Sequence, residues 1–355
     1  MNKFRVLIVD DSITQREIFR RLLADDPELS VVAEARNGIE AVEQAKSCSP
    51  DVILMDIHMP EMDGIQATAE IMRQCPVPIV IASATLKKRD VDLAMHAYEA
   101  GAVSVIEKPE GAVLLYLQKI APDLRRELIA ASKAKIRRPR LSAGSRSTSI
   151  PTANSHSESW PSLRSVRVIG ICASTGGPPI LLKILSDVPK PFPIPILLVQ
   201  HISRHFEEGF ARWLSEASGH PVNLASSGQR LERGVWMSPG GRHLTVTLDG
   251  RIDLPPAKSS DIHCPSGNPL FESLASNCGP RAMGIQLTGM GDDGADGLNC
   301  LKQKGGVTII QEESTCMIWG MPKAAKENGS ALYELCPDEI ARMISATGSL
   351  AYPVN

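Results

Sequence analysis

Short apolar runs and amphipathic segments alternate regularly over about the first 130 residues of the chain. The apolar runs have the length of buried strands, and the segments between them repeat their apolar residues with a helical period. Five such strand–helix pairs indicate a doubly wound parallel sheet. The predicted strands cover 4–9, 31–35, 51–55, 79–82 and 102–106, and the predicted helices cover 12–24, 38–47, 63–74, 91–100 and a stretch from about 111.

A polar stretch between residues 132 and 165 interrupts this pattern. Its central part, 142–162, consists mostly of Ser, Thr, Ala, Pro, Asn and His. Such a stretch buries too little apolar surface to offset the entropy lost on ordering, so we expect a flexible linker. Strands and helices alternate again beyond it, which predicts a second doubly wound α/β domain. The expected division is therefore a first domain over 1–122, a helix end and linker over 123–164, and a second domain over 165–350.

Charged and hydroxyl side chains follow the predicted strands of the first domain. Asp10 and Asp11 follow the first strand, Asp56 the third, Ser83 the fourth and Lys108 the fifth. Three clustered carboxylates repel one another unless a cation lies between them, and oxygen ligands suit Mg²⁺. A carboxylate beside Mg²⁺ can accept a phosphoryl group, which Lys108 would neutralise and Ser83 would hydrogen-bond. The alternative for Asp10 and Asp11 is capping of the first helix.

In the second domain, Ser174 stands between a predicted strand over 166–172 and a helical pattern that carries proline in its first turn. A hydroxyl at this place projects above a sheet beside free backbone N–H groups and the positive end of a helix dipole. This favours an oxygen nucleophile. The motif is not the G-x-S-x-G elbow, because Cys172 occupies the position of its first glycine. Taken alone, the segment also fits a phosphate-binding or structural glycine turn.

Two further polar residues follow predicted strands of the second domain. His201 comes directly after the apolar run 194–200, and Asp293 lies in a glycine-rich loop after the run 284–288. Histidine can take a seryl proton, and a carboxylate can orient it and stabilise the imidazolium. The three residues together predict a serine hydrolase. Separately, His201 could cap the next helix and Asp293 could be a turn residue.

Composition limits the class of protein. The formal net charge is −2 and the isoelectric point is near 6.5, so no overall basic character predicts binding of nucleic acid or of anionic membranes. No apolar run is long enough to insert in a membrane, and no signal peptide is apparent. Eight cysteines without a C-x-x-C pair indicate reduced thiols and a cytoplasmic location. We expect no metal in the second domain, although His201 and His205 have a spacing that can chelate one on a helix.

These residues resemble known families. Residues 1 to about 122 resemble a response-regulator receiver domain, which has a flavodoxin-like fold, through Asp10/Asp11, Asp56, Ser83 and Lys108-Pro109. Residues from about 165 to 347 resemble the Rossmann-like catalytic domain of the CheB family of chemotaxis protein-glutamate methylesterases. The matching motifs of this second domain lie at 173–177, 200–201, 238–243, 287–294 and 320–322.

The resemblance implies Ser174 as nucleophile, His201 as base and Asp293 as the orienting carboxylate. It also implies oxyanion support near Met290 and Gly291.

The resemblance further places Thr175 close to His201. The implied reaction is hydrolysis of glutamyl methyl esters on methyl-accepting chemoreceptors, with deamidation of receptor glutamines. The implied partners are those receptors and a histidine kinase of the CheA type. The implied cofactor is Mg²⁺ in the receiver, with none in the esterase site. Phosphorylation of Asp56 would then uncover the catalytic cleft.

The chain departs from the family pattern at several positions. Ile202 to Phe206 replaces the usual Met-Pro-Pro-Gly-Phe, and Gly241 replaces an aspartate. Asn268 exchanges a carboxylate for an amide. We expect these segments to line the cleft and to affect substrate preference. Asp292 adds a carboxylate beside Asp293, with which it could share the orienting role.

In the receiver, Val105 replaces a common aromatic switch residue. Signal transmission would then depend on loop and interface packing.

Three other functions remain open at this point. A related esterase or amidase could act on a non-receptor substrate, and a response regulator could use its second domain only to dock receptors. A transcription regulator would need a helix-turn-helix after the linker, where strands and helices alternate instead.

Overall fold

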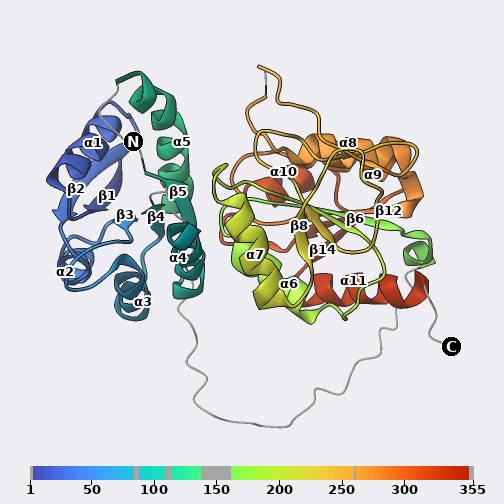
Figure 1. Cartoon of the computed structure of the whole chain (residues 1–355), viewed down its shortest axis with the longest axis horizontal. Helices are drawn as coiled ribbons and strands as arrows, with labels where there is room; N and C mark the ends of the chain where they lie inside the picture. The colour runs from blue at the N-terminus through green and yellow to red at the C-terminus, as the bar shows by residue number, and fades with distance from the viewer. Residues whose placement is uncertain (1–2, 84–87, 109–113, 137–160, 260, 352–355) are drawn as a thin grey trace, which may run out of the picture.

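The structure, a computed structural model, describes residues 3–83, 88–108, 114–136, 161–259 and 261–351. Two parallel sheets, each flanked by helices, lie side by side (Figure 1). The predicted α/β class with two doubly wound sheets is confirmed. The expected linker falls largely on residues 137–160, outside the described residues.

The first sheet has the strand order β2-β1-β3-β4-β5, the order of flavodoxin-like folds. Its inner strands β3 and β4 are buried along their whole length, because helices cover both faces; this explains their continuous apolar sequences. The strands are β1 (Phe4–Val9), β2 (Leu29–Ala35), β3 (Val52–Asp56), β4 (Ile79–Ser83) and β5 (Ser104–Glu107). The helices are α1 (Ile13–Ala24), α2 (Gly38–Cys48), α3 (Gly64–Gln74), α4 (Lys88–Ala100) and α5 (Leu114–Ser132).

The second sheet has the order β14-β13-β12-β6-β7-β9-β8 and is parallel throughout. Its strands are β6 (Val168–Ala173), β7 (Ile196–Gln200), β8 (Val222–Leu224), β9 (Val235–Met237), β12 (Ala282–Gln286), β13 (Val307–Gln311) and β14 (Tyr333–Leu335), and a short antiparallel hairpin adds β10 (Thr245–Val246) and β11 (Ile252–Asp253). The helices are α6 (Gly177–Asp187), α7 (Glu207–Ser218), α8 (Gly267–Asn277), α9 (Ala295–Gln303), α10 (Met321–Glu327) and α11 (Pro337–Ala351), with 3₁₀ turns η1 (Pro161–Ser165), η2 (Gly279–Arg281) and η3 (Glu313–Thr315).

The chain leaves the central strand β6 toward β7 and later returns to β12 on the other side of β6. The strand order therefore reverses between β6 and β12, and such a switch point opens a crevice at the carboxyl ends of the strands. Paired glycines let α8 approach β6 and α9 approach β12 closely. Gly170 of β6 and Gly284 of β12 face each other in register, and a Cβ on Gly170 would lie 2.6 Å from a methyl carbon of Leu274.

The two domains contact each other through the β5 side of the first sheet. Helix α4 packs against α6 and α7 (Figure 1). The rings of Tyr98 and Trp213 lie 6.2 Å apart across this contact, and the Trp213 indole N–H donates to Glu99 Oε1 over 3.0 Å. One of the three clusters of buried apolar residues contains residues of both domains.

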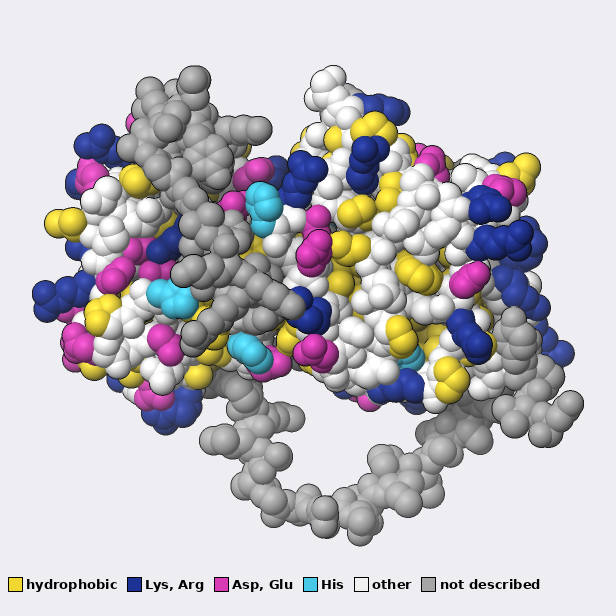
Figure 2. All heavy atoms as spheres, in the orientation of Figure 1, with side chains coloured by type: hydrophobic (Ala, Val, Ile, Leu, Met, Phe, Trp, Pro, Cys, Tyr) yellow, Lys and Arg dark blue, Asp and Glu magenta, His cyan; other side chains and the backbone are white. Residues whose placement is uncertain are grey.

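The surface carries no sign of a nucleic-acid site on the face that Figure 2 shows. There, Lys and Arg side chains are interspersed with Asp and Glu over the described residues, with no continuous basic stripe. Among the described helices, none is both long and apolar enough to cross a membrane.

Candidate functional site

Ser174, His201 and Asp293 lie in the connections that follow β6, β7 and β12, three neighbouring strands. The Ser174 backbone N–H donates to the Thr288 carbonyl over 3.0 Å, which holds the end of β6 against the loop after β12. The His201 N–H donates to the Ala173 carbonyl over 3.0 Å and so joins the ends of β6 and β7. The structure thus brings the three predicted residues to the switch point of the sheet.

The loop after β12 passes very close to Ser174. A Cβ on Gly289 would lie 2.7 Å from the Ser174 Cβ and 2.2 Å from Met321 Sδ. Only glycine fits here, and its small size brings the loop that carries Met290 and Gly291 close to Ser174. Gly291 has φ +87°, a conformation that favours glycine.

His201 and Asp293 form a hydrogen-bonded pair. His201 Nε2 lies 2.9 Å from Asp293 Oδ2. The same carboxylate accepts from the Ser266 hydroxyl and from the Gly267 N–H, the latter over 2.7 Å. Among the described residues no hydrogen bond joins the Ser174 hydroxyl to His201, and such bonds often form only when substrate binds.

Asp293 is buried, and burial alone would raise its pKa. The hydrogen bond and charge of His201 outweigh that effect, together with the bonds from Gly267 and Ser266, and lower the pKa of Asp293 to about 2. The carboxylate is therefore ionised at neutral pH, so His201 Nε2 must donate the proton in their bond. The other ring nitrogen, Nδ1, is left to accept one.

His263 is a site residue that sequence reasoning missed. Its ring stacks on that of His201, with centroids 4.6 Å apart and planes 10° from parallel. Burial, with the charge of His201 next in size, lowers the pKa of His263 to about 4. Its ring is therefore neutral near pH 7. The sequence offered one signal, its place just before the Pro265–Ser266 pair of the cleft segment.

The segment after His263 makes hydrogen bonds that hold Asp293 and join α8 to α9. Ser266 and Gly267 hold Asp293, and neither was predicted as a site residue. The side-chain oxygen of Asn268 accepts from the Gly297 N–H over 2.9 Å. The amide that replaces the usual carboxylate thus joins α8 to α9.

The first domain gathers a second set of predicted residues at the edge of its sheet. Lys108 Nζ lies 2.7 Å from Asp10 Oδ2 and 2.8 Å from Asp56 Oδ1. Burial raises the pKa of Asp56, and Lys108 only partly offsets that effect. Ser83 ends β4, the strand beside β3 and β5.

Ligand atoms of Asp10, Asp11 and Asp56 all lie within 4.8 Å of one another. Asp10 and Asp56 are buried, whereas Asp11 is exposed. Three carboxylates around one point are the oxygen donor set that Mg²⁺ takes, so these residues fit the ion.

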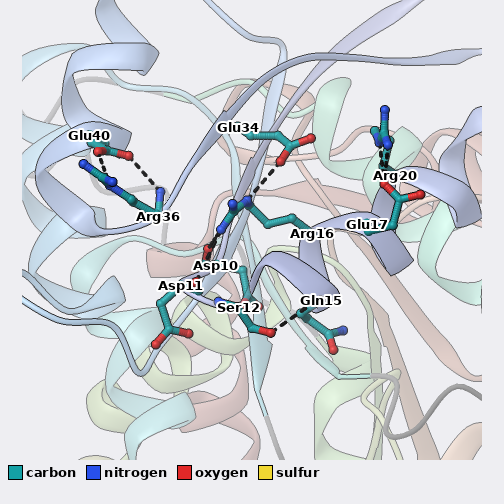
Figure 3. Close-up of polar contacts among 10 residues, drawn as sticks. All are labelled: Asp10, Asp11, Ser12, Gln15, Arg16, Glu17, Arg20, Glu34, Arg36 and Glu40. Carbon is teal, nitrogen blue, oxygen red and sulfur yellow. Dashed lines mark hydrogen bonds and ion pairs between the residues drawn. The ribbon is translucent and has the colours of Figure 1, made fainter.

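Figure 3 shows how the turn before α1 is held. Asp10 Oδ1 accepts from the Ser12 N–H over 2.9 Å, and Ser12 in turn caps α1 by accepting from Gln15. Arg16 donates to the Asp10 carbonyl over 2.7 Å and pairs with Glu34. The cap of α1 is therefore Ser12, and Asp10 Oδ2 pairs with Lys108 Nζ.

The first domain also contacts the residues next to Ser174. Thr175 Oγ1 donates to Glu127 Oε1 of α5 over 3.0 Å, so the threonine hydroxyl meets the first domain and not His201. The Gly176 N–H donates to the Val103 carbonyl over 3.3 Å. Met290 packs against apolar residues of the first domain.

Comparisons with known proteins agree with both domains. Residues 169–344 match the family described as CheB methylesterase, and residues 6–118 match the response regulator receiver domain. A protein-glutamate methylesterase/protein-glutamine glutaminase of Syntrophus aciditrophicus is 40% identical over 98% of this chain and 99% of its own length. The chain belongs to the CheB methylesterase family. The predicted membership is confirmed.

Two further relatives are similar to this CheB-type chain. A protein-glutamate methylesterase/protein-glutamine glutaminase of Anaeromyxobacter dehalogenans is 42% identical over 95% of this chain and 97% of its own length. The crystal structure of the Thermotoga maritima CheB methylesterase catalytic domain is 32% identical, with a TM-score of 0.48, over 51% of this chain and 98% of that chain.

Two departures from the CheB pattern lie at the domain contact or beside it. His205 Nδ1 lies 2.9 Å from Glu107 Oε2 of β5, so the altered segment after His201 contacts the receiver. Gly241 has φ +73° and lies beside the Arg204 side chain.

The two neighbouring acids of the catalytic loop should differ in their effect on hydrolysis. Asp293→Asn should reduce kcat by about 10⁴-fold, because an amide cannot stabilise imidazolium. Asp292 is exposed, so Asp292→Asn should stay within about twofold. Steady-state rates of both variants, with circular dichroism as the folding control, check this; equal losses would contradict the assignment to Asp293.

His263 should position the His201 ring. His263→Ala should lower kcat about 2- to 12-fold, since stacked aromatic pairs contribute ~0.5–1.5 kcal/mol. His263→Phe keeps a stacking ring and should recover most of that loss. The dependence of kcat on pH distinguishes a positioning role from a purely structural defect. Only His263→Ala should shift the acid limb of the kcat–pH profile. An unaltered kcat in His263→Ala would refute the positioning role.

Proposed function

We propose that the chain is a serine esterase that hydrolyses glutamyl methyl esters on methyl-accepting chemoreceptors and deamidates their glutamines. The observation that carries this proposal is the buried His201–Asp293 pair, 2.9 Å apart, at the strand end beside Ser174. The names of the relatives, protein-glutamate methylesterase/protein-glutamine glutaminase, support the substrate class.

In this mechanism Ser174 Oγ attacks the ester carbonyl while His201 Nδ1 takes its proton. Asp293 keeps the other nitrogen protonated and stabilises the imidazolium. His201 then returns the proton to the leaving methoxide, and methanol departs from an acyl-enzyme on Ser174. Water, deprotonated by His201, attacks that acyl-enzyme and releases the glutamate side chain and the free serine.

The negative oxygen of each tetrahedral intermediate needs hydrogen-bond donors. We assign this role to backbone N–H groups near Met290 and Gly291, with support from Thr175. The close approach of Gly289 to Ser174 supports the assignment, because it places this loop beside the reacting carbon.

Ser174→Ala is the direct test of the esterase. The variant should lose methanol release from methylated receptor fragments almost completely, because it lacks the hydroxyl oxygen that attacks the ester carbonyl in the proposed mechanism. Phosphorylation by a small phosphodonor should be unchanged. Exposed Ser47→Ala serves as the control. Wild-type turnover in Ser174→Ala would refute the serine mechanism, and receptor binding without turnover in the wild type would favour a docking protein.

The proposal includes control by phosphorylation, with a histidine kinase of the CheA type as donor. Asp56 accepts the phosphoryl group. Bound Mg²⁺, held by Asp10, Asp11 and Asp56, would neutralise the charge of the transferring group. Ser83 and Lys108 then move toward the phosphorylated residue and change the β5 surface.

Contacts beside the nucleophile support this control. Glu127 accepts from Thr175, the residue next to Ser174, and Glu107 and Glu99 accept from His205 and Trp213. Three receiver carboxylates thus face three donors on the catalytic domain. A receiver in this position restricts access to Ser174, and a change at β5 would loosen it.

Removing one of these contacts should raise the basal esterase rate. Glu127→Ala deletes the acceptor of Thr175, and loss of a hydrogen bond of ~1 kcal/mol should increase the open population by up to about fivefold. The rate without phosphodonor, compared with the distant control Glu43→Ala, measures this. Asp56→Asn should make the rate independent of phosphodonor. An unchanged rate in Glu127→Ala would contradict steric inhibition.

A further inference from the structure

A thiol lies beside the proposed catalytic pair. Cys172 is fully buried in β6, and its Sγ lies 4.0 Å from Asp293 Oδ2. His201 Nε2 lies 2.9 Å from the same oxygen. The ligand atoms of Cys172, His201 and Asp293 all lie within 4.8 Å of one another. The proposed reaction uses no thiol, so this sulfur is chemically unassigned.

The three groups come from a rigid part of the fold. Cys172 lies within β6, His201 directly follows β7, and Asp293 is held by Ser266 and Gly267. Gly267 packs closely against the thiol, since a Cβ there would lie 2.6 Å from Cys172 Sγ. These contacts hold the three donor atoms near one another without substrate.

Thiolate, imidazole and carboxylate are the ligand types of zinc. Bond lengths of about 2.0–2.3 Å place the ligands of a tetrahedral zinc roughly 3.3–3.8 Å apart. The separations of 2.9 and 4.0 Å to Asp293 Oδ2 lie on either side of that range, and the third pair lies within 4.8 Å, so small shifts of the side chains would be needed to complete the geometry. Three protein ligands leave the fourth position for water, on the side where the His201 side chain is 14% exposed.

We propose that Cys172, His201 and Asp293 form an inhibitory zinc site within the esterase centre. The metal would bond to Cys172 Sγ, His201 Nε2 and Asp293 Oδ2 and replace the hydrogen bond between the histidine and the carboxylate. Without that bond Asp293 no longer orients His201, and ester hydrolysis stops. This inference rests on the proposed roles of His201 and Asp293 and makes the metal a reversible inhibitor.

Binding requires the net loss of one proton. The Cys172 thiol gives its proton to solvent or buffer, the His201 proton moves from Nε2 to Nδ1, and the metal loses water ligands. Mg²⁺ prefers an all-oxygen set and would remain at the receiver.

The test uses the full-length protein in excess Mg²⁺ with buffered Zn²⁺. Methanol release from a methylated receptor fragment is measured for each protein relative to its own metal-free rate. Wild-type protein should be inhibited at micromolar Zn²⁺ and recover with a chelator. Cys172→Ser, which keeps the size of the side chain, should need at least tenfold more Zn²⁺. Cys278→Ala, at the end of α8, should behave as wild type.

A second measurement does not depend on activity. Cobalt(II) added to the metal-free protein should give the near-ultraviolet thiolate-to-metal charge-transfer band, lost in Cys172→Ser and retained in Cys278→Ala. Absence of this band in wild type, or equal zinc sensitivity in both cysteine variants, would overturn the proposal. A cobalt band without methanol release would instead show that the site exists and that the proposed esterase function is wrong.

Discussion

The arrangement of the catalytic domain depends on one buried carboxylate. Asp293 accepts hydrogen bonds from His201, Gly267 and Ser266, and these groups come from two other parts of the chain. A buried ion is stable only when such partners replace water. Its charge therefore connects the end of β7, the start of α8 and the loop after β12.

Close approach of backbones provides the second constraint. Gly289 brings its loop against Ser174, Gly170 lets α8 pack on β6, and Gly284 lets α9 pack on β12. Because Cys172 is buried beside Asp293, a single compact region contains Ser174, the His201–Asp293 pair and the Cys172 thiol.

The contact between the domains uses the same strand ends. Glu127 reaches Thr175 and the Val103 carbonyl accepts from Gly176, so the receiver lies against the turn that carries Ser174. In the first domain, Lys108 pairs with Asp10 and Asp56 at the far edge of its sheet. Strand β5 lies between those two regions, which is the physical basis of the proposed control.

The sequence by itself determined the two α/β domains, because both-face burial requires continuous apolar strands separated by amphipathic helices. It also placed Ser174, His201, Asp293 and the receiver acids at strand ends, since parallel topology brings those ends together. Tertiary structure alone decided the rest. His263 and Cys172 join the site through stacking and packing between segments about 30 to 120 residues apart, and no local spacing encodes such distances. Two adjacent aspartates look alike in the sequence. The structure distinguishes them, because Asp293 is buried and Asp292 is exposed.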